Sequence, residues 1–326
     1  MHIPFPELAS TARVVSLPLR TRFRGIDVRE AMLLRGPAGW TEFSPFVEYG
    51  DEEASVWLRA AIDFGWNDAP AAGRVRVNAT LPVVSVDRVP DVLARFPGAR
   101  TVKVKVADPA STVAEDAARV AAVRRSIGPE GRIRVDANGA WTVDEAEHAI
   151  HAFAVHDLEY VEQPCATLED MAEIRRRVKY MGVPIAADES VRKAADPLAV
   201  VAAGAADILV LKAQPLGGIR AALRIAKEAG LPVVVSSALE TSVGISMGAH
   251  LAVQLGTDEY DAGLGTAALL AADITASPLL PTDGAIDVRR IEPDEDLLER
   301  HTAPPERQLW WMQRLERCAA LPSPRD

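Results

Sequence analysis

A repeat of short apolar runs, each followed by a polar residue, is the feature that most constrains the fold of this chain. From about residue 75 onward, runs rich in β-branched residues alternate with longer segments of helical periodicity. Six runs end in a polar residue, namely Lys105, Asp136, Glu162, Asp188, Lys212 and Ser236. These residues are 31, 26, 26, 24 and 24 positions apart, about the length of one strand–helix unit. The repeat predicts a parallel sheet whose strands end at a common edge.

Eight such runs favour a closed barrel over an open sheet. We expect strands at 75–79, 101–106, 133–135, 160–161, 185–187, 208–211 and 233–235, and a weak eighth strand near Tyr260. Helices are expected between them at 112–127, 143–155, 168–179, 217–229 and 241–255. The predicted fold class is therefore α/β, with the barrel at residues 75–270.

The segments on either side of the barrel follow a different pattern. Before it, we expect strands at 12–19, 26–35 and 39–44, with a hairpin turn at 36–39, and a helix at 52–65. These elements predict a small α+β capping domain at residues 1–74. After residue 270 the alternation stops, so residues 271–326, with a helix near 306–319, are expected to return and complete the cap.

Composition and charge argue against several classes of function. The net charge of −10 over 326 residues disfavours nonspecific binding to nucleic acid or to anionic membranes. No stretch reaches the ~20 apolar residues of a membrane span, and no basic region followed by an apolar run marks a signal peptide. Cys165 and Cys318 imply no disulfide framework. We therefore expect a cytoplasmic protein without nucleic-acid or membrane partners, and the oligomeric state stays open.

Three carboxylates occupy equivalent positions on successive predicted strands. Asp136, Glu162 and Asp188 each follow a buried run, so they should converge at one edge and repel one another. An Asp after a strand is also a common helix N-cap, but three acids in register favour a site for a hard cation. Mg²⁺ prefers such oxygen ligands, and no His or Cys is placed to suggest zinc or copper. Arg134 shares the face of Asp136, so we expect it in or beneath the site.

Three lysines flank these acids. Lys103 and Lys105 alternate with valines, so both should point into the barrel while the valines pack outward. Lys212 ends the buried run 208–211 on the sixth predicted strand, across the barrel from Lys105. Lysines are rarely buried unless they are paired or functional, so an interior salt bridge or an exposed edge strand is the structural alternative.

This arrangement predicts the removal of a proton next to a carboxylate. A substrate carboxylate bound to Mg²⁺ would have its developing enediolate charge stabilised electrostatically. One lysine would take the α-proton, because burial and neighbouring cations can leave a lysine partly neutral near pH 7.

The same residues form a set of motifs that resembles the muconate-lactonizing subgroup of the enolase superfamily. The motifs are Lys103-Val-Lys105, Asp136-Ala-Asn138, Glu162-Gln-Pro164, Asp188-Glu-Ser190 and Lys212. Members of that superfamily use a Lys or His base with magnesium. The resemblance covers nearly the whole chain. It implies a modified TIM barrel of the (β/α)7β type with an α+β cap, and a Mg²⁺ cofactor for which Mn²⁺ can substitute.

Within that superfamily the chain resembles the o-succinylbenzoate synthase family. Residues 236–244 and 261–266 look like the segments of that family at the seventh and eighth strands. The resemblance implies dehydration of 2-succinyl-6-hydroxy-2,4-cyclohexadiene-1-carboxylate to 2-succinylbenzoate in menaquinone biosynthesis. The expected partner is therefore a small-molecule carboxylate.

The resemblance also implies individual roles. Lys105 would abstract the proton and then help hydroxide leave, while Lys212 would stabilise the intermediate from the opposite side. Asp136, Glu162 and Asp188 would hold the metal. The predicted substrate-binding residues are Lys103, Arg24, Asn138, Ser236, Ser237 and Gly263.

Several other functions remain open at this point. An N-succinylamino acid racemase or a dipeptide epimerase needs the same metal and lysines, as does a lactonizing cycloisomerase. Dipeptide epimerases commonly carry an acidic pair after strand 8, whereas Asp261-Ala-Gly263 offers one acid. A Schiff-base aldolase needs one buried lysine but no cluster of acids. A binding module without catalysis usually loses one of these residues, and none is lost here.

Overall fold

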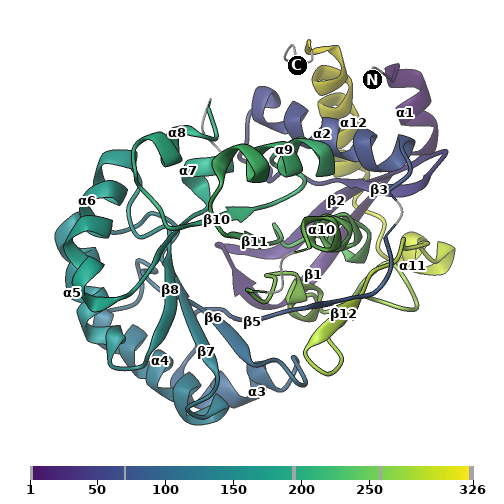
Figure 1. Cartoon of the computed structure of the whole chain (residues 1–326). Helices are drawn as coiled ribbons and strands as arrows, with labels where there is room; N and C mark the ends of the chain where they lie inside the picture. Colours follow the sequence, from purple (N-terminus) through teal and green to yellow (C-terminus); the bar gives the residue numbers. More distant parts are fainter. Residues whose placement is uncertain (1–2, 70, 193–195, 257–258, 323–326) are drawn as a thin grey trace.

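A curled parallel sheet forms the centre of the larger part of the molecule (Figure 1). The computed structural model describes residues 3–69, 71–192, 196–256 and 259–322. In spatial order the sheet contains β5 (Ala79–Leu81), β6 (Thr101–Lys105), β7 (Arg132–Asp136), β8 (Leu158–Glu162), β9 (Ile185–Ala187), β10 (Ile208–Leu211) and β11 (Val233–Val235). Neighbouring strands pair in parallel throughout. The predicted α/β fold class is confirmed.

Helices cover the outer face of this sheet (Figure 1). They are α3 (Val89–Leu93), α4 (Val113–Ile127), α5 (Val143–Ala154), α6 (Leu168–Val178), α7 (Glu189–Arg192), α8 (Ala199–Ala202), α9 (Ile219–Ala229) and α10 (Ser242–Leu255), with 3₁₀ turns η1 (Val86–Arg88), η2 (Lys179–Met181) and η3 (Gly265–Leu269). Thr112 and Thr142 begin α4 and α5 with capping boxes. The predicted start of α9 at residue 217 is wrong by two positions, because Gly217 and Gly218 hold positive φ angles. No helix in the described ranges combines the length and apolarity needed to span a bilayer.

Two residues, rather than a strand, close the barrel. Within the described part of the chain, Ala262 bridges to Val77 and Gly263 bridges to Ser236, both in parallel. The Ala262 N–H donates to the Arg76 carbonyl at 2.8 Å, and the Gly263 N–H donates to the Val235 carbonyl at 2.8 Å. The weak eighth strand expected near Tyr260 is thus reduced to a bridging segment between the first and last strands.

The single strand expected at 75–79 is wrong. The chain instead forms β4 (Arg74–Arg76), which pairs antiparallel with β12 (Ala285–Asp287), and then β5, which pairs with β6. Between them, the Val77 N–H donates to Gly284 and the Asn78 N–H donates to Ala262. The strand divides because its backbone changes hydrogen-bonding partners at each step, which the apolar pattern does not reveal.

The capping domain joins both ends of the described chain (Figure 1). Its elements are α1 (Phe5–Thr11), the antiparallel strands β1 (Arg13–Phe23), β2 (Ile26–Gly36) and β3 (Gly39–Phe43), then α2 (Asp51–Trp66), α11 (Glu295–Arg300) and α12 (Pro305–Ala320). Phe43 and Trp311 pack edge to face with ring centroids 5.8 Å apart, in a core that also contains Trp57. The domain boundaries after residues 74 and 270 stay predictions.

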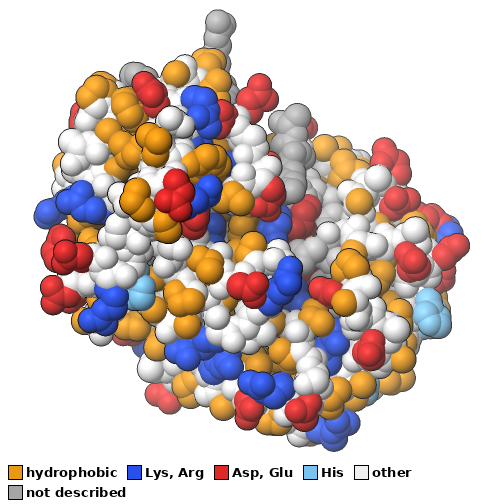
Figure 2. Space-filling view, turned by 180° about the vertical axis from the view of Figure 1, so that it is seen from behind, with side chains coloured by type: hydrophobic (Ala, Val, Ile, Leu, Met, Phe, Trp, Pro, Cys, Tyr) orange, Lys and Arg blue, Asp and Glu red, His pale blue; other side chains and the backbone are white. Residues whose placement is uncertain are grey.

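The hairpin turn expected at 36–39 is present between β2 and β3. A Cβ on Gly36 would lie 2.1 Å from the Gly65 carbonyl oxygen of α2, so only glycine allows this close approach. The face drawn in Figure 2 has a mixed chemical character. Acidic, basic and hydrophobic side chains are interspersed on it rather than gathered by type.

A buried arginine connects several segments of the barrel beneath the carboxyl ends of its strands. Arg134 on β7 is fully buried, forms an ion pair with Glu159, and donates to the Asn78 side chain at 3.1 Å and to the Asp261 carbonyl at 2.6 Å. Its guanidinium also stacks on the Tyr160 ring at 4.8 Å. The residue therefore lies beneath the strand ends, as expected, and links β7 and β8 to the segment that closes the barrel.

A buried carboxylate of the cap holds the last barrel helix. Glu42 on β3 accepts hydrogen bonds from the Thr241 N–H at 3.1 Å, the Thr241 hydroxyl at 2.6 Å and the Gly244 N–H at 3.0 Å. These are donors at the N-terminus of α10, which an acceptor from another domain caps here. Burial, followed by repulsion from Glu240, raises the pKa of Glu42 to about 7.

We predict that Arg134→Met lowers the free energy of unfolding by about 3 kcal/mol, since it removes the fully buried partner of the Glu159 carboxylate, whose side chain is only 12% exposed. Urea denaturation measures this loss. Arg132→Met is the matched control, because Arg132 also pairs with Glu159, at 3.1 Å, but its side chain is 45% exposed. The control should lose less than about 1 kcal/mol. Equal losses in the two variants would contradict the assigned role of Arg134.

We predict that Glu42→Gln changes how stability depends on pH. The folded state keeps a proton on Glu42 that the unfolded chain releases near the ordinary pKa of 4.5. The wild type therefore loses stability as pH rises from about 4.5 to about 7, by up to about 3 kcal/mol relative to the variant. Urea denaturation of both proteins at pH 5 and pH 8 measures the change. A constant difference between them would show that Glu42 does not titrate in this window.

Candidate active site

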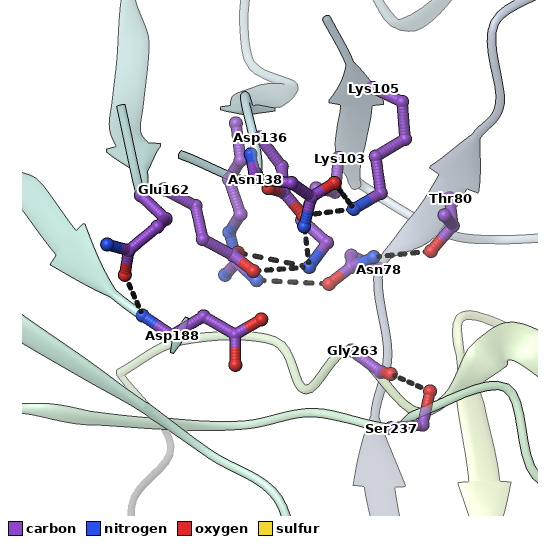
Figure 3. A network of polar contacts seen from close by, with 12 residues as sticks. Asn78, Thr80, Lys103, Lys105, Asp136, Asn138, Glu162, Asp188, Ser237 and Gly263 are labelled. Atoms are coloured by element: carbon purple, nitrogen blue, oxygen red, sulfur yellow. Dashed lines mark hydrogen bonds and ion pairs between the residues drawn. The ribbon is translucent and has the colours of Figure 1, made fainter. Parts of the chain in front are cut away.

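A cavity lies at the carboxyl ends of the barrel strands, under the hairpin that joins β1 to β2. In barrel enzymes this is the catalytic face. The structure brings eight of the predicted site residues to its lining, namely Arg24, Lys103, Lys105, Asn138, Lys212, Ser236, Ser237 and Gly263. Figure 3 shows Lys103 and Lys105 beside the carboxylates, with Ser237 and Gly263 across from them.

The three predicted metal ligands lie at neighbouring strand ends. Asp136 is the last residue of β7, Glu162 is the last residue of β8, and Asp188 follows β9 directly. The parallel register places Asp136 beside both Lys105 and Glu162. All three carboxylates are at most 1% exposed. Their heights are therefore fixed by backbone pairing rather than by flexible loops.

Each carboxylate is paired with a lysine, and Figure 3 shows the pairs that Lys103 and Lys105 form. Lys103 Nζ lies 2.9 Å and 3.0 Å from the two Glu162 oxygens and 3.4 Å from Asp136. Lys105 forms an ion pair with Asp136 and donates to the Asn138 side-chain oxygen at 2.7 Å. Lys212 Nζ lies 2.5 Å from Asp188. The predicted interior lysines are thus both paired and exposed to a cavity.

The carboxylates affect one another electrostatically. Burial, followed by repulsion from Asp136, raises the pKa of Glu162 to about 7. Burial also opposes the charges of Asp136 and Asp188, but their lysine partners outweigh it and hold both pKa values below the ordinary range. Burial lowers the pKa of Lys105 despite the nearby Asp136. A cation that served all three acids would relieve the repulsion recorded at Glu162.

The ligand set is close together but not assembled around one point. Among the residues that the structure describes, no three acidic, His or Cys side chains lie close enough to hold a metal ion as they stand. The carboxylate oxygens form ion pairs with the lysine ammonium groups instead. The donor set still fits a hard cation, because Asp136, Glu162 and Asp188 supply only oxygen from adjacent strand ends and the charges of the two aspartates both act on Glu162.

Two site residues were not identified from the sequence. Arg192 on α7 binds Asp188 through Nε at 3.0 Å and Glu189 through Nη2 at 2.6 Å, and its Nη1 donates to the Tyr49 hydroxyl at 3.1 Å. It therefore connects a predicted metal ligand to the capping domain. The spacing of four residues from Asp188 to Arg192 was the available signal, but the described part of α7 is a single turn, too short for a helical pattern to be recognised in the sequence.

Gln163 holds the strand ends in place. It has a positive φ of 40° and its side-chain oxygen accepts from the Asp188 N–H at 3.0 Å and the Ser190 N–H at 3.1 Å. Its amide donates to the Cys165 carbonyl at 2.8 Å and the Ser190 hydroxyl at 2.7 Å. A motif residue to which the sequence assigned no role thus fixes the backbone around Asp188.

The cap supplies the roof of the cavity. Arg24 and Gly25 form the two-residue turn between β1 and β2, with φ angles of 50° and 77° that suit a type I′ hairpin. The Arg24 guanidinium lies 4.2 Å from the Phe46 ring centroid and donates to the Tyr49 hydroxyl at 3.4 Å. Arg24 is therefore held over the cavity by the cap, in the region expected from the sequence.

Comparison with known proteins agrees with this geometry. Residues 90–295 match the family described as enolase C-terminal domain-like, and residues 14–65 match the enolase N-terminal domain-like family. Among solved structures, muconate lactonizing enzyme from Pseudomonas fluorescens superposes with a TM-score of 0.77 at 21% identity, covering 90% of this chain and 98% of that one. N-succinyl Arg/Lys racemase from Bacillus cereus superposes with a TM-score of 0.72 at 20% identity, covering 90% and 97%. At such identities the likeness shows the fold alone.

Sequence relatives are much closer. The o-succinylbenzoate synthase of Thermobifida fusca is 55% identical over 88% of this chain and 90% of its own length. Those of Mycolicibacterium smegmatis and Mycobacterium tuberculosis are 52% and 51% identical, over 97% and 98% of this chain and 97% and 96% of their own lengths. Enzymes of this superfamily act on small carboxylates and use a divalent metal, typically Mg²⁺. The chain belongs to the o-succinylbenzoate synthase family of the enolase superfamily.

Proposed function

We propose that this chain dehydrates 2-succinyl-6-hydroxy-2,4-cyclohexadiene-1-carboxylate to 2-succinylbenzoate, a step of menaquinone biosynthesis. One observation carries the proposal. Two largely buried lysines, Lys105 and Lys212, reach one cavity from different strands and are paired with the strand-end acids Asp136 and Asp188. The relatives that share this sequence over nearly their whole length bear the name of that enzyme. The alternative racemase and epimerase functions gain no specific support.

Lys105 is the proposed general base. It would take the proton from the carbon next to the substrate carboxylate, and it would then return that proton to the departing hydroxyl group as water leaves. The base must be neutral at the start, and burial lowers the pKa of Lys105 in this direction. Asn138, which accepts from Lys105 at 2.7 Å, would orient the amine. Using one residue as base and then as acid places both events on the same face of the ring.

Asp136, Glu162 and Asp188 are the proposed ligands of Mg²⁺, for which Mn²⁺ can substitute. When bound, the metal would stabilise the negative charge that develops on the substrate carboxylate as the proton leaves. Holding it would require Asp136 and Asp188 to exchange their lysine partners for the cation. Lys105 and Lys212 would then lose their ion pairs and become available to the cavity, while Lys103 stays next to Glu162.

The remaining residues would bind and orient the substrate. Lys212 would stand on the other side of the ring as a cation and stabilise the anionic intermediate. Ser236, Ser237 and Gly263 would face the succinyl arm, and Arg24 would cover it from the cap. A Cβ on Gly263 would lie 2.4 Å from the Ser236 hydroxyl oxygen, so a larger residue would close this part of the cavity.

We also propose that the enzyme works in the cytoplasm. Cys165 and Cys318 are both free and buried, as expected in a reducing compartment.

We predict that Lys105→Ala and Lys212→Ala each lower kcat of the dehydration by about 10³-fold or more, because each removes a group that acts on the reacting carbon. A spectrophotometric assay with the cyclohexadiene substrate measures the loss. Racemisation of N-succinyl amino acids should be assayed in parallel, and it should be slower than dehydration. Lys227→Ala, an exposed lysine on α9, is the control and should keep full activity. Near-native kcat in either site variant would remove that lysine from the mechanism.

We predict that Asp136→Asn, Glu162→Gln and Asp188→Asn each weaken Mg²⁺ binding by about 10-fold or more, since each removes a charged oxygen ligand. Isothermal titration calorimetry on chelator-treated protein measures the affinity. EDTA should abolish activity, and Mg²⁺ or Mn²⁺ should restore it. Asp261→Asn, a buried acid that accepts from Thr101 at 2.7 Å, is the control and should bind Mg²⁺ normally. Full activity after exhaustive chelation would exclude the metal.

A further inference from the structure

One wall of the cavity is a short loop that follows β11. Ser236, Ser237, Ala238 and Leu239 all line the cavity, two strands further along the sheet than the last of the three acids. Leu239 has a φ of 64°, a left-handed conformation that non-glycine residues rarely adopt. A conformation of this kind persists only where the surroundings enforce it.

A buried side chain of the capping domain supplies that constraint. Arg29 on β2 is 2% exposed, and its Nε donates to the Leu239 carbonyl at 3.1 Å. Its Nη2 donates to the Ala238 carbonyl at 3.4 Å and also to the Ser44 carbonyl. The guanidinium lies 4.4 Å from the Phe46 ring centroid, which fixes its plane. Hydrogen bonds from a charged donor are stronger than neutral ones, so Arg29 sets the direction of two successive peptide groups.

The other side of one of these peptides carries a donor without an acceptor. A trans peptide points its N–H away from its carbonyl, so the Leu239 N–H points away from Arg29. The two preceding N–H groups of the loop both have acceptors. The Ser237 N–H donates to the Gly263 carbonyl at 3.1 Å, and the Ala238 N–H donates to the Glu240 carboxylate at 2.6 Å. Within the described ranges no group accepts from the Leu239 N–H. Buried amides are almost always paired, and Leu239 lines the cavity, so we expect the acceptor to come from a molecule bound there.

We propose that the Leu239 amide binds an oxygen at the end of the non-reacting arm of the substrate, and that Arg29 is the positioning residue that aims it. The lysines hold the reacting ring near β6 and β10, so an arm attached to that ring extends along the remaining wall. The inference rests on the proposed function, which identifies the arm as a succinyl chain ending in a carboxylate. Arg29 itself touches no substrate and acts through the loop.

The test compares two substrates in two enzymes. The first substrate carries the succinyl arm, and the second carries a butanoyl arm, in which a methyl group replaces the terminal carboxylate. The wild type should lose about 10- to 100-fold in kcat/KM on the butanoyl analogue, as a lost hydrogen bond to a charged group predicts. Arg29→Met should lose about 10-fold on the succinyl substrate, mostly through KM, and little on the butanoyl analogue. The variant should therefore discriminate less between the arms.

Further variants keep the test decisive if Arg29→Met folds poorly. Arg29→Lys keeps the buried charge but cannot reach both loop carbonyls in one plane, so it should show a smaller loss of the same kind. Glu42→Gln is the matched control, since Glu42 is equally buried at the same interface but contacts α10 rather than residues 236–239. It should discriminate between the arms as the wild type does.

Each outcome has a separate meaning. If both Arg29 variants lose equal factors on the two substrates, the role of Arg29 is general stability and the inference fails while the proposed function stands. If the wild type treats the two arms alike, the Leu239 amide does not bind the arm and the inference also fails. If the wild type does not dehydrate the succinyl substrate at all, the proposed function and the inference fail together.

Discussion

The register of the parallel sheet is the constraint on which the site depends. Residues paired across β6, β7 and β8 stand at one height, so Lys105, Asp136 and Glu162 meet at the same edge without help from any loop. Buried charges of one sign at such close quarters would be prohibitive. Lysines reduce this cost, because Lys103 pairs with Glu162, Lys105 pairs with Asp136 and Lys212 pairs with Asp188. Under the proposed function, a cation that bound the acids would release Lys105 and Lys212 from these ion pairs.

The capping domain completes the site from above rather than merely covering it. Arg24 and Phe46 form part of the cavity lining, and Tyr49 receives a hydrogen bond from Arg192, which also binds Asp188. Below the rim, Glu42 caps a barrel helix and Arg29 holds a barrel loop. Charged side chains of the cap are thus buried against backbone groups of the barrel. Residues of the cap and of the barrel therefore line the same cavity.

Much of this site could be predicted from the sequence, because the polar residues at the strand ends recur at nearly constant spacing. Lys105, Asp136, Glu162, Asp188, Lys212 and Ser236 could be placed from spacing alone, and the family motifs added Asn138, Ser237 and Gly263. The pattern failed where long-range partners decide the structure. The strand expected at 75–79 splits because Val77 and Asn78 bond to Gly284 and Ala262, far away in sequence. Arg29 and Arg192 were not identified from the sequence, because the residues around them do not indicate that either arginine is buried.

The central claim is that three acids share one cation while two lysines face the reacting ring from opposite sides. A crystal structure with Mg²⁺ and 2-succinylbenzoate measures this directly. The account predicts oxygens of Asp136, Glu162 and Asp188 at roughly 2.1 Å from the metal, and Lys105 and Lys212 Nζ on opposite faces of the ring. A metal held elsewhere, or a ring with both lysines on one face, would contradict it.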